Sequence, residues 1–497
     1  MFNAILSANV SPGLIILYCI LGAIGALLIY MVLRAICMKK KKYPTDYVPQ
    51  EVDKDEITNL LVGAIRIPTV TKYHEGDDQS SFPIYHEYLK KSFPEIFKRA
   101  EVTVINQYSL IIKIKGSDES LTPGCLLAHQ DVVPAPREGW ECDPFSGEIK
   151  DGYVYGRGSS DMKSQMITAL YGLELLLREG KEPVRTIYYC FGHDEEATGR
   201  EGAAYIVKYL QEQGIRFEFV LDEGGTILDG KLLGINGKVA LIGTCEKGYA
   251  DFILTSVKDG GHASSPKRKS SVDAIADAIH DLRRSPMKAT WSEPLKGTFN
   301  ALAPYMNPVY RFLFANRVVL SPLLKFVLGI VNPLTNSILR TTFAFTQMQG
   351  STAPNVIPTK ATAIVNTRIN INETKEEVQA YIQKVVGKDI KVEPYGNGYN
   401  PTPVSKTNTP VYDDLLRSIV EVYEGFIPAP YPFIAATDAK HYYAVCDKVY
   451  RFTPFEMSMD DQKRIHALNE RCSIDGLVKA SQFFKRFIEN TCYNEKH

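Results

Sequence analysis

One long apolar segment lies near the start of the chain. Leu14 to Leu33 is a run of twenty residues without a charge, and a helix needs this length to cross about 30 Å of hydrocarbon. No Lys or Arg precedes the run, whereas Arg34 and the lysines at 39–42 follow it. A cleaved signal peptide normally has a positive segment first and a shorter apolar stretch. The pattern therefore predicts an uncleaved membrane-spanning helix, and the positive-inside rule places the rest of the chain in the cytoplasm.

After a short linker, apolar runs of strand length alternate with segments of helical spacing. The strand-like runs are residues 102–115, 125–128, 186–191 and 217–221. The helical segments are residues 57–67, 166–177 and 203–213. Strands that alternate with helices predict an α/β fold, in which helices cover both faces of a largely parallel sheet.

The pattern changes at Gly243, where several strand-like runs are separated by only two helical segments, at 271–282 and 375–385. This order predicts a small α+β domain inserted into the larger one. We therefore divide the chain into four parts. These are an anchor and linker (1–50), the first part of the main domain (51–247), the insert (248–396) and the second part of the main domain (397–497).

An apolar stretch at 299–345 interrupts the insert. Ser321, Pro322 and Lys325 break it and Pro333 closes it, so no continuous run of membrane length remains. Its simplest interpretation is additional core. The alternatives are a hydrophobic wall for an apolar substrate, or a surface that rests on the bilayer to which the N-terminal helix brings the protein.

Composition narrows the range of functions. Lys plus Arg and Asp plus Glu are equal at 57 each, so the net charge is zero, and no excess of positive charge indicates a nucleic-acid partner. The nine cysteines are scattered without a CxxC pair. This argues against a disulfide framework or a cysteine-ligated zinc and is typical of free thiols in a reducing compartment.

Polar motifs follow three of the predicted strands: HQDVVP from His129, DEE at 194–196 and DEGG at 222–225. A fourth, GRGSSDMK, places Asp161 just before a helix, where an Asp commonly serves as a cap. Each motif alone has a structural explanation, and adjacent carboxylates such as those at 195 and 196 are usually solvated. Because the carboxyl ends of parallel strands share one edge of a sheet, we expect the clusters to converge there.

The converging side chains form a set that could bind metal. The predicted ligands are His129, Asp161, Glu196, Asp222 and His441. Imidazole and carboxylate without thiolate suit zinc, and also manganese or cobalt. With two divalent ions and a bridging carboxylate, room remains for a water between the ions, as a catalytic site requires.

In order and spacing, these motifs resemble the two-zinc metallopeptidase family that contains aminoacylase, carboxypeptidase S, glutamate carboxypeptidase and succinyl-diaminopimelate desuccinylase. The resemblance runs from about Asp53 to the C-terminus. It implies a zinc-peptidase-like mixed sheet with an inserted lid, or dimerisation, domain. It also implies that Asp161 bridges two zinc ions, with His129 and Asp222 at one ion and Glu196 and His441 at the other.

The same resemblance assigns roles beyond the ligands. Glu195 matches the general base, and Asp131 matches the carboxylate that orients the ligand His129. In the insert, His262 in GGHASSP corresponds to the lid histidine that reaches the partner subunit's site in dimeric members. This implies a homodimer formed through the lid. Three further substrate-binding residues are implied: Asn355 for the substrate carbonyl, Arg368 for its carboxylate, and His466, whose role is unassigned.

Within the family, the ILRTT motif at 338–342 and the N-terminal segment favour the branch of carboxypeptidase S and the N-acyl-amino-acid hydrolases. The substrate is then a peptide that loses its C-terminal residue or an N-acyl amino acid, and the apolar insertion favours a fatty acyl group. Members of this branch are lumenal or secreted, which conflicts with the cytoplasmic placement by the lysines.

Two other functions are consistent with the fold. A membrane-tethered protein that binds amino acids or peptides, without metals, would have no need of Asp131 and Glu195. A metal-dependent esterase would use the same chemistry, but Arg368 favours a substrate with a free carboxylate.

Overall fold

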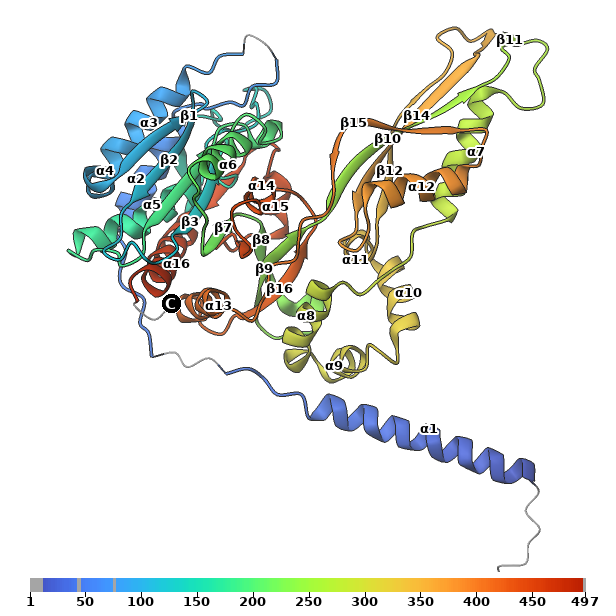
Figure 1. The fold of residues 1–497 in the computed structure, drawn as a ribbon, viewed down its shortest axis with the longest axis horizontal. Helices are drawn as coiled ribbons and strands as arrows, with labels where there is room; N and C mark the ends of the chain where they lie inside the picture. Colours follow the sequence, from blue (N-terminus) through green and yellow to red (C-terminus); the bar gives the residue numbers. More distant parts are fainter. Residues whose placement is uncertain (1–11, 43–45, 75–76, 495–497) are drawn as a thin grey trace, which may run out of the picture.

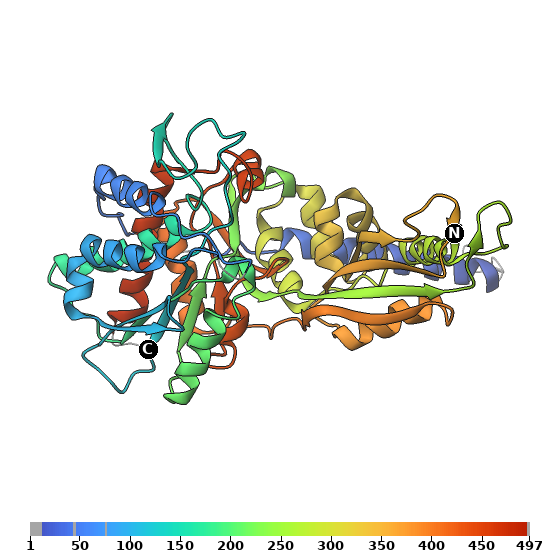
Figure 2. The same ribbon diagram turned by 90° about the horizontal axis from the view of Figure 1, so that it is seen from above.

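The computed structural model describes residues 12–42, 46–74 and 77–494. It has a main body built on a large sheet and a lid that projects from it (Figures 1 and 2). A helical insertion lies between the lid, the main body and the N-terminal helix α1 (Pro12–Ile36).

The main sheet has the order β1-β2-β6-β3-β7-β17-β9-β16, with β8 paired to β9. Its strands are β1 (Glu101–Ile105), β2 (Ser109–Ile114), β3 (Gly124–His129), β6 (Ile187–Gly192), β7 (Phe219–Asp222), β8 (Gly225–Asp229), β9 (Lys238–Glu246), β16 (Ile427–Phe433) and β17 (Val449–Arg451). The central pairs β6–β3, β3–β7 and β7–β17 are parallel, whereas β1 and β2 form an antiparallel edge. The predicted mixed α/β sheet is confirmed.

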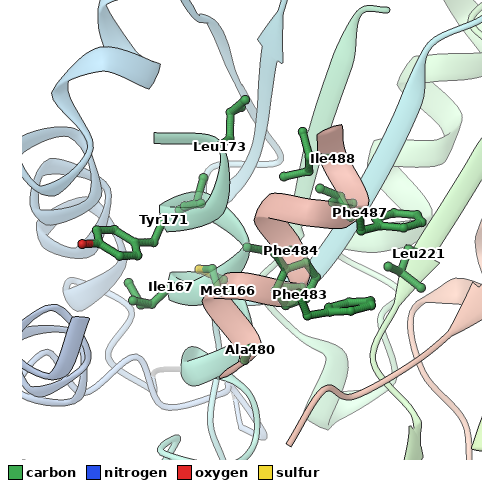
Figure 3. Close-up of a cluster of buried hydrophobic side chains, with 14 of the residues drawn as sticks. Met166, Ile167, Tyr171, Leu173, Leu221, Ala480, Phe483, Phe484, Phe487 and Ile488 are labelled. Atoms are coloured by element: carbon green, nitrogen blue, oxygen red, sulfur yellow. The ribbon is translucent and has the colours of Figure 1, made fainter. Parts of the chain in front are cut away.

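Helices cover both faces of this sheet. One face carries α2 (Lys54–Ile65), α3 (Ser81–Ser92), α4 (Pro94–Arg99), α5 (Lys163–Arg178), α13 (Pro410–Val422) and α16 (Ile474–Cys492), and the other α6 (Ala203–Glu212) and α14 (Ala439–Tyr442). Figure 3 shows α5 and α16 in contact through Met166, Phe483 and Phe484. They approach so closely at Gly172 that a Cβ there would lie 2.6 Å from the backbone nitrogen of Lys485. This packing fixes the start of α5, which follows Asp161.

Short elements line the rim of the main body. They are β4 (Glu148–Lys150), β5 (Tyr153–Tyr155), α15 (Met459–Arg464), β18 (Arg471–Ser473) and the 3₁₀ turns η2 (Glu195–Ala197), η3 (Gly230–Leu233) and η4 (Ala303–Tyr305). β18 pairs with β5, which holds the segment between α15 and β18 near the loop that precedes α5.

The lid is a four-stranded antiparallel sheet of order β12-β14-β10-β15. Its elements are β10 (Gly248–Val257), β12 (Thr342–Gln349), β14 (Lys360–Ile369), β15 (Lys391–Tyr399), α7 (Ser271–Arg284) and α12 (Lys375–Val386). Both helices begin with a capping box, at Ser270 and Thr374, and pack their apolar sides on the sheet. At the lid tip, β11 (Gly261–His262) pairs with β13 (Val356–Ile357).

The insertion contains α8 (Glu293–Leu302), α9 (Pro308–Ala315), α10 (Ser321–Val331) and α11 (Pro333–Leu339). Part of it is core, as the sequence favoured: Phe299 and Phe314 stack with ring centroids 4.0 Å apart inside a buried cluster. The rest is exposed, with Phe326 and Ile330 on α10 more than 60% accessible. Among the described residues, α1 is the single helix long and apolar enough to cross a membrane.

Candidate metal centre

The parallel strands deliver acidic and imidazole side chains to one edge of the main sheet. His129 is the last residue of β3, the turn η2 after β6 holds Glu195 and Glu196, and Glu223 directly follows β7. Asp161 reaches the same place from the loop before α5, and His466 from the loop before β18. The predicted convergence of strand-end motifs is therefore present in the structure.

These side chains form two overlapping groups. In the first, Nε2 of His129 lies 3.1 Å from Oδ1 of Asp161 and 3.4 Å from Oε1 of Glu223. In the second, Nε2 of His466 lies 3.0 Å from Oδ2 of Asp161 and 3.1 Å from Oε2 of Glu196. Asp161 thus presents one carboxylate oxygen to each group, which is the geometry of a bridging ligand.

Asp131 forms hydrogen bonds to residues of both groups from the protein interior. It is fully buried, and its two carboxylate oxygens accept the backbone N–H groups of Glu195 at 3.2 Å and Glu196 at 3.1 Å. The Asp131 carbonyl oxygen lies 2.9 Å from Nδ1 of His129, so Nε2 faces the site. Such hydrogen bonds from behind orient metal ligands. Asp131 therefore contacts both the His129 ring and the backbone of η2.

A second supporting carboxylate, Glu470, was not identified from the sequence. It is buried, accepts the backbone N–H of Ser160 at 2.7 Å and of Asp161 at 3.1 Å, and pairs with Arg157 at 2.5 Å. Glu470 therefore fixes the loop that carries Asp161. Glu470 lies four residues after His466 in the same sequence motif. This proximity to a predicted site residue is the feature of the sequence that could have identified it.

Crowding and burial disfavour the anionic forms of these carboxylates when no cation is present. Burial raises the pKa of Glu195 well above its ordinary value and that of Glu223 to about 8, and it also raises the pKa of Glu196. Hydrogen bonds to Asp161 and Glu196 raise the pKa of His466 to about 10. The group therefore holds protons tightly, and a divalent cation that binds here must displace them.

The donor set fits a divalent metal. Ligand atoms of His129, Asp161 and Glu196 lie within 4.8 Å of one another, as do those of His129, Glu195 and Glu223. Oε1 of Glu196 is buried and has no hydrogen-bond partner in the described part of the chain. Such an orphaned oxygen is costly unless a cation completes its environment. Imidazole and carboxylate ligands suit zinc.

Among the described residues, the two candidate ligand groups include neither Asp222 nor His441, which were also predicted as ligands. Asp222 is buried, and its oxygens accept the backbone N–H groups of Glu223 at 2.8 Å and Ala439 at 2.9 Å. It therefore joins the end of β7 to the start of α14. His441 lines the neighbouring cleft, and burial lowers its pKa to about 4. Glu223 and His466 provide the side-chain atoms that lie close to His129 and Asp161.

Comparison with known proteins identifies the family of this chain. The family model of peptidase family M20/M25/M40 matches residues 125–490. The chain belongs to this family.

Curated M20 relatives match along most of their length. An N-fatty-acyl-amino acid synthase/hydrolase of Xenopus tropicalis is 40% identical over 89% of this chain and 87% of its own length. Carboxypeptidase S of Saccharomyces cerevisiae is 29% identical over 86% of this chain and 83% of its own. The metallo-carboxypeptidase Sso-CP2 of Sulfolobus solfataricus, an M20 structure, has the same fold, with a TM-score of 0.61, 18% identity and coverage of 88% and 99%.

The M20 relationship establishes the general activity. This chain is a metallo-exopeptidase or amidohydrolase that cleaves an amide bond next to a free carboxylate. Membership of the family implies a divalent metal, and groups of residues that could hold one are present.

An open cleft of about 930 Å³ runs from the metal centre toward the lid. Glu195, His441 and His466 line it on the main body, and Arg368 lines it from the base of the lid. The Arg368 guanidinium lies 5.2 Å from the ring centroid of Tyr249, which supports it beside the cleft. The predicted carboxylate-binding arginine is therefore close to the metal centre.

The other two predicted substrate-binding residues of the M20 lid are distant from this cleft. His262 is exposed in β11 and pairs in register with Val356 in β13, next to Asn355 (Figure 1). The Asn355 carbonyl accepts the backbone N–H of Ala263 at 3.0 Å. The two residues lie together at the lid tip.

Proposed function

We propose that this M20 enzyme hydrolyses N-acyl amino acids with long acyl chains, by means of two zinc ions. The observation that carries the proposal is the double use of Asp161, whose two oxygens face two separate sets of ligands. One ion would be held by His129, Asp161 and Glu223, and the other by Asp161, Glu196 and His466. Manganese or cobalt would fit the same donors.

The surrounding residues suggest how the bond is broken. Divalent ions held by these residues would supply Lewis-acid chemistry for the scissile carbonyl and an activated water. Glu195, beside His129 and Glu223, takes a proton from the attacking water and returns it to the leaving amine. A carboxylate within reach of the water and of the leaving amine can carry out both proton transfers. Asp131 keeps Glu195 in place through the backbone of η2.

Arg368 would select the substrate's free carboxylate. A planar guanidinium can hold a carboxylate with two parallel hydrogen bonds, and Arg368 shares a cleft with Glu195 and His466. A substrate whose carboxylate binds Arg368 would place its amide bond toward the metal centre. The acyl group would then extend away from Arg368.

The names of the similar proteins favour a fatty acyl group. N-fatty-acyl-amino acid synthase/hydrolases of Xenopus tropicalis and Mus musculus are 40% and 35% identical to this chain. The similarity to yeast carboxypeptidase S supports a second candidate, the removal of a C-terminal residue from a peptide. Both reactions cleave an amide next to a carboxylate, so they differ only in what the acyl side carries.

Location and assembly belong to the same proposal. We assign α1 as a membrane anchor on the basis of its length, its apolar composition and its exposure. The charge pattern favours a cytoplasmic main body, and the sequence resemblance favours a lumenal or extracellular one. A homodimer through the lid would explain why His262 lies far from its own chain's cleft, since it could then complete the partner's site.

The test is turnover by the full chain in detergent against N-acyl amino acids of increasing chain length and against dipeptides. We expect hydrolysis that chelation abolishes, that zinc restores, and that Glu195→Gln reduces by at least about 100-fold. Glu201→Gln, which changes an exposed carboxylate on the same loop, is the matched control and should retain activity. Preference for dipeptides would favour the carboxypeptidase, and turnover that is unaffected by chelation would refute the proposal.

A further inference from the structure

Helix α10 exposes its apolar side instead of burying it. Leu323, Phe326, Val327 and Ile330 recur at helical spacing and are 54%, 66%, 38% and 68% exposed, whereas Leu324 on the opposite side is buried. Val331 and Leu334, 69% and 48% exposed, continue the stripe into α11. We call these six exposed residues the α10 surface.

A surface of this kind needs a partner. Single exposed apolar residues are ordinary, but contiguous apolar patches mark sites of association with proteins, ligands or membranes. The α7 helix of the same chain shows the usual arrangement, with Ala274, Ile275, Ala278 and Leu282 all buried against the lid sheet. The α10 surface is therefore a specific feature of the insertion.

The insertion is attached directly to the end of α1. Nδ2 of Asn316 donates to the Met31 carbonyl at 3.0 Å, and Nη2 of Arg311 donates to the carbonyls of Ile36 at 3.0 Å and Met38 at 2.7 Å. Met31 is one of the few buried side chains of α1. Figure 1 shows the end of α1 beside α9, the helix that precedes α10 in the chain. Whatever surrounds the end of α1 is thus close to the insertion that carries the α10 surface.

The chain segment that carries the α10 surface is basic. No Asp or Glu stands between Glu293 and Glu373, and none precedes Asp46. Arg34 at the end of α1 and Glu293 both lie near Arg317: after burial, Arg34 lowers the pKa of Arg317 and Glu293 raises it. Apolar side chains on a segment with an excess of basic residues suit a bilayer with anionic headgroups.

We propose that the α10 surface rests in the headgroup and upper acyl region of an anionic lipid bilayer, beside α1. The main body is then held against the membrane at two places, the anchor and the insertion. This contact does not depend on the proposed substrate, because it concerns α10 and not the metal centre.

The test measures lipid contact at single positions of the full chain. Among the nine cysteines only Cys19 and Cys37 are exposed, so a chain with both changed to Ala accepts an environment-sensitive fluorophore at one introduced Cys. Phe326→Cys and Ile330→Cys place it on the α10 surface. Ile149→Cys, 53% exposed on β4, is the matched control on the main body.

Each labelled chain is reconstituted into phosphatidylcholine–phosphatidylserine vesicles, with or without lipid that carries a spin-label quencher. We expect quenching of at least about twofold at positions 326 and 330 and none at 149, because an interfacial helix buries its apolar side among the lipids. A cooperative unfolding transition in urea confirms that each chain is folded, and hydrolysis of a short soluble substrate is measured separately.

Two outcomes would overturn the proposal. If positions 326 and 330 resemble 149 and are quenched by aqueous iodide, the α10 surface faces water. If neither lipid quencher nor iodide reaches them, a protein, such as a second copy, covers this surface. A folded chain that is inactive but shows lipid quenching would refute the proposed function and leave the membrane contact standing.

Discussion

Single substitutions of the two adjacent acidic residues at the end of β7 test which of them is a metal ligand. Glu223 lies 3.4 Å from Nε2 of His129, whereas Asp222 accepts two backbone N–H groups. Glu223→Gln and Asp222→Asn each remove one negative charge and keep the shape of the side chain. The two variants should nevertheless fail in different ways.

Magnitudes follow from these contacts. Supporting residues one layer behind a metal ligand are worth about 10- to 100-fold in metal affinity, so loss of the ligand Glu223 should cost at least about 100-fold, or roughly 2.8 kcal/mol. Asp222→Asn keeps one acceptor oxygen and turns an amide N–H₂ toward the second N–H. A lost hydrogen bond to a charged group costs about 1.5–3 kcal/mol. Relief of the buried charge offsets part of this, so we expect the free energy of unfolding to fall by about 2 kcal/mol.

Two measurements separate the variants. Metal content after dialysis is determined by elemental analysis, and the free energy of unfolding by urea titration in the presence of chelator, so that bound metal does not contribute. Glu223→Gln should lose metal and keep its metal-free stability, whereas Asp222→Asn should keep metal and lose stability. If Asp222→Asn loses metal at unchanged stability while Glu223→Gln retains it, the assignment from the structure is refuted.

Further predictions follow from the same geometry. His466→Ala should lower the bound metal toward one ion per chain and kcat by at least about 100-fold, whereas His441→Ala should keep both ions; elemental analysis and steady-state kinetics distinguish them. Arg368→Met should raise KM for N-acyl amino acids about 30-fold with a smaller effect on kcat, and the same loss in both parameters would contradict a binding role. Zinc binding should release protons and tighten as pH rises from about 6 to 8, because the metal-free pKa of His466 is raised to about 10; calorimetry in buffers of different ionisation enthalpy measures this, and no buffer dependence would exclude it. Mixed chains carrying His262→Ala and Glu195→Ala should regain activity that neither has alone if the lid histidine acts in the partner's site, and no recovery in a proven mixed dimer would argue against it.

The sequence predicted the main sheet because buried parallel strands appear as short continuous runs of apolar residues. The buried run before His129 and the run before DEE predicted strands whose carboxyl ends meet at one edge, and the structure has them as β3 and β6. Hydrogen bonding between parallel strands fixes that edge. The ends of β3 and β6 bring His129 and Glu196 together in this way, and Asp161 joins them from the loop before α5.

The remaining two ligand positions could not be predicted from spacing alone. Asp222 ends β7 and Glu223 follows it, so the two side chains point in different directions, and the backbone turn that decides between them depends on Gly224 at φ +88°. His441 and His466 both lie outside the strands. At such positions the alternation of apolar and polar residues does not show which way a side chain points. Only contacts distant in sequence, such as the pairing of β18 with β5, bring His466 to Asp161.

The insertion shows a different limit. Apolar content alone favoured additional core, and α8 and α9 do supply core residues such as Phe299 and Phe314. Helical spacing in α10 predicts an apolar side but does not say whether that side faces inward. The orientation is set by Leu324, which packs inward, and by the turn of the chain at Pro333.

Anomalous X-ray diffraction at the zinc absorption edge, from crystals of the full chain grown with zinc, locates the bound ions. We expect two peaks separated by the Asp161 carboxylate, one bounded by His129 and Glu223 and the other by Glu196 and His466. A single peak, or a peak coordinated by Asp222 or His441, would refute the proposed two-metal centre.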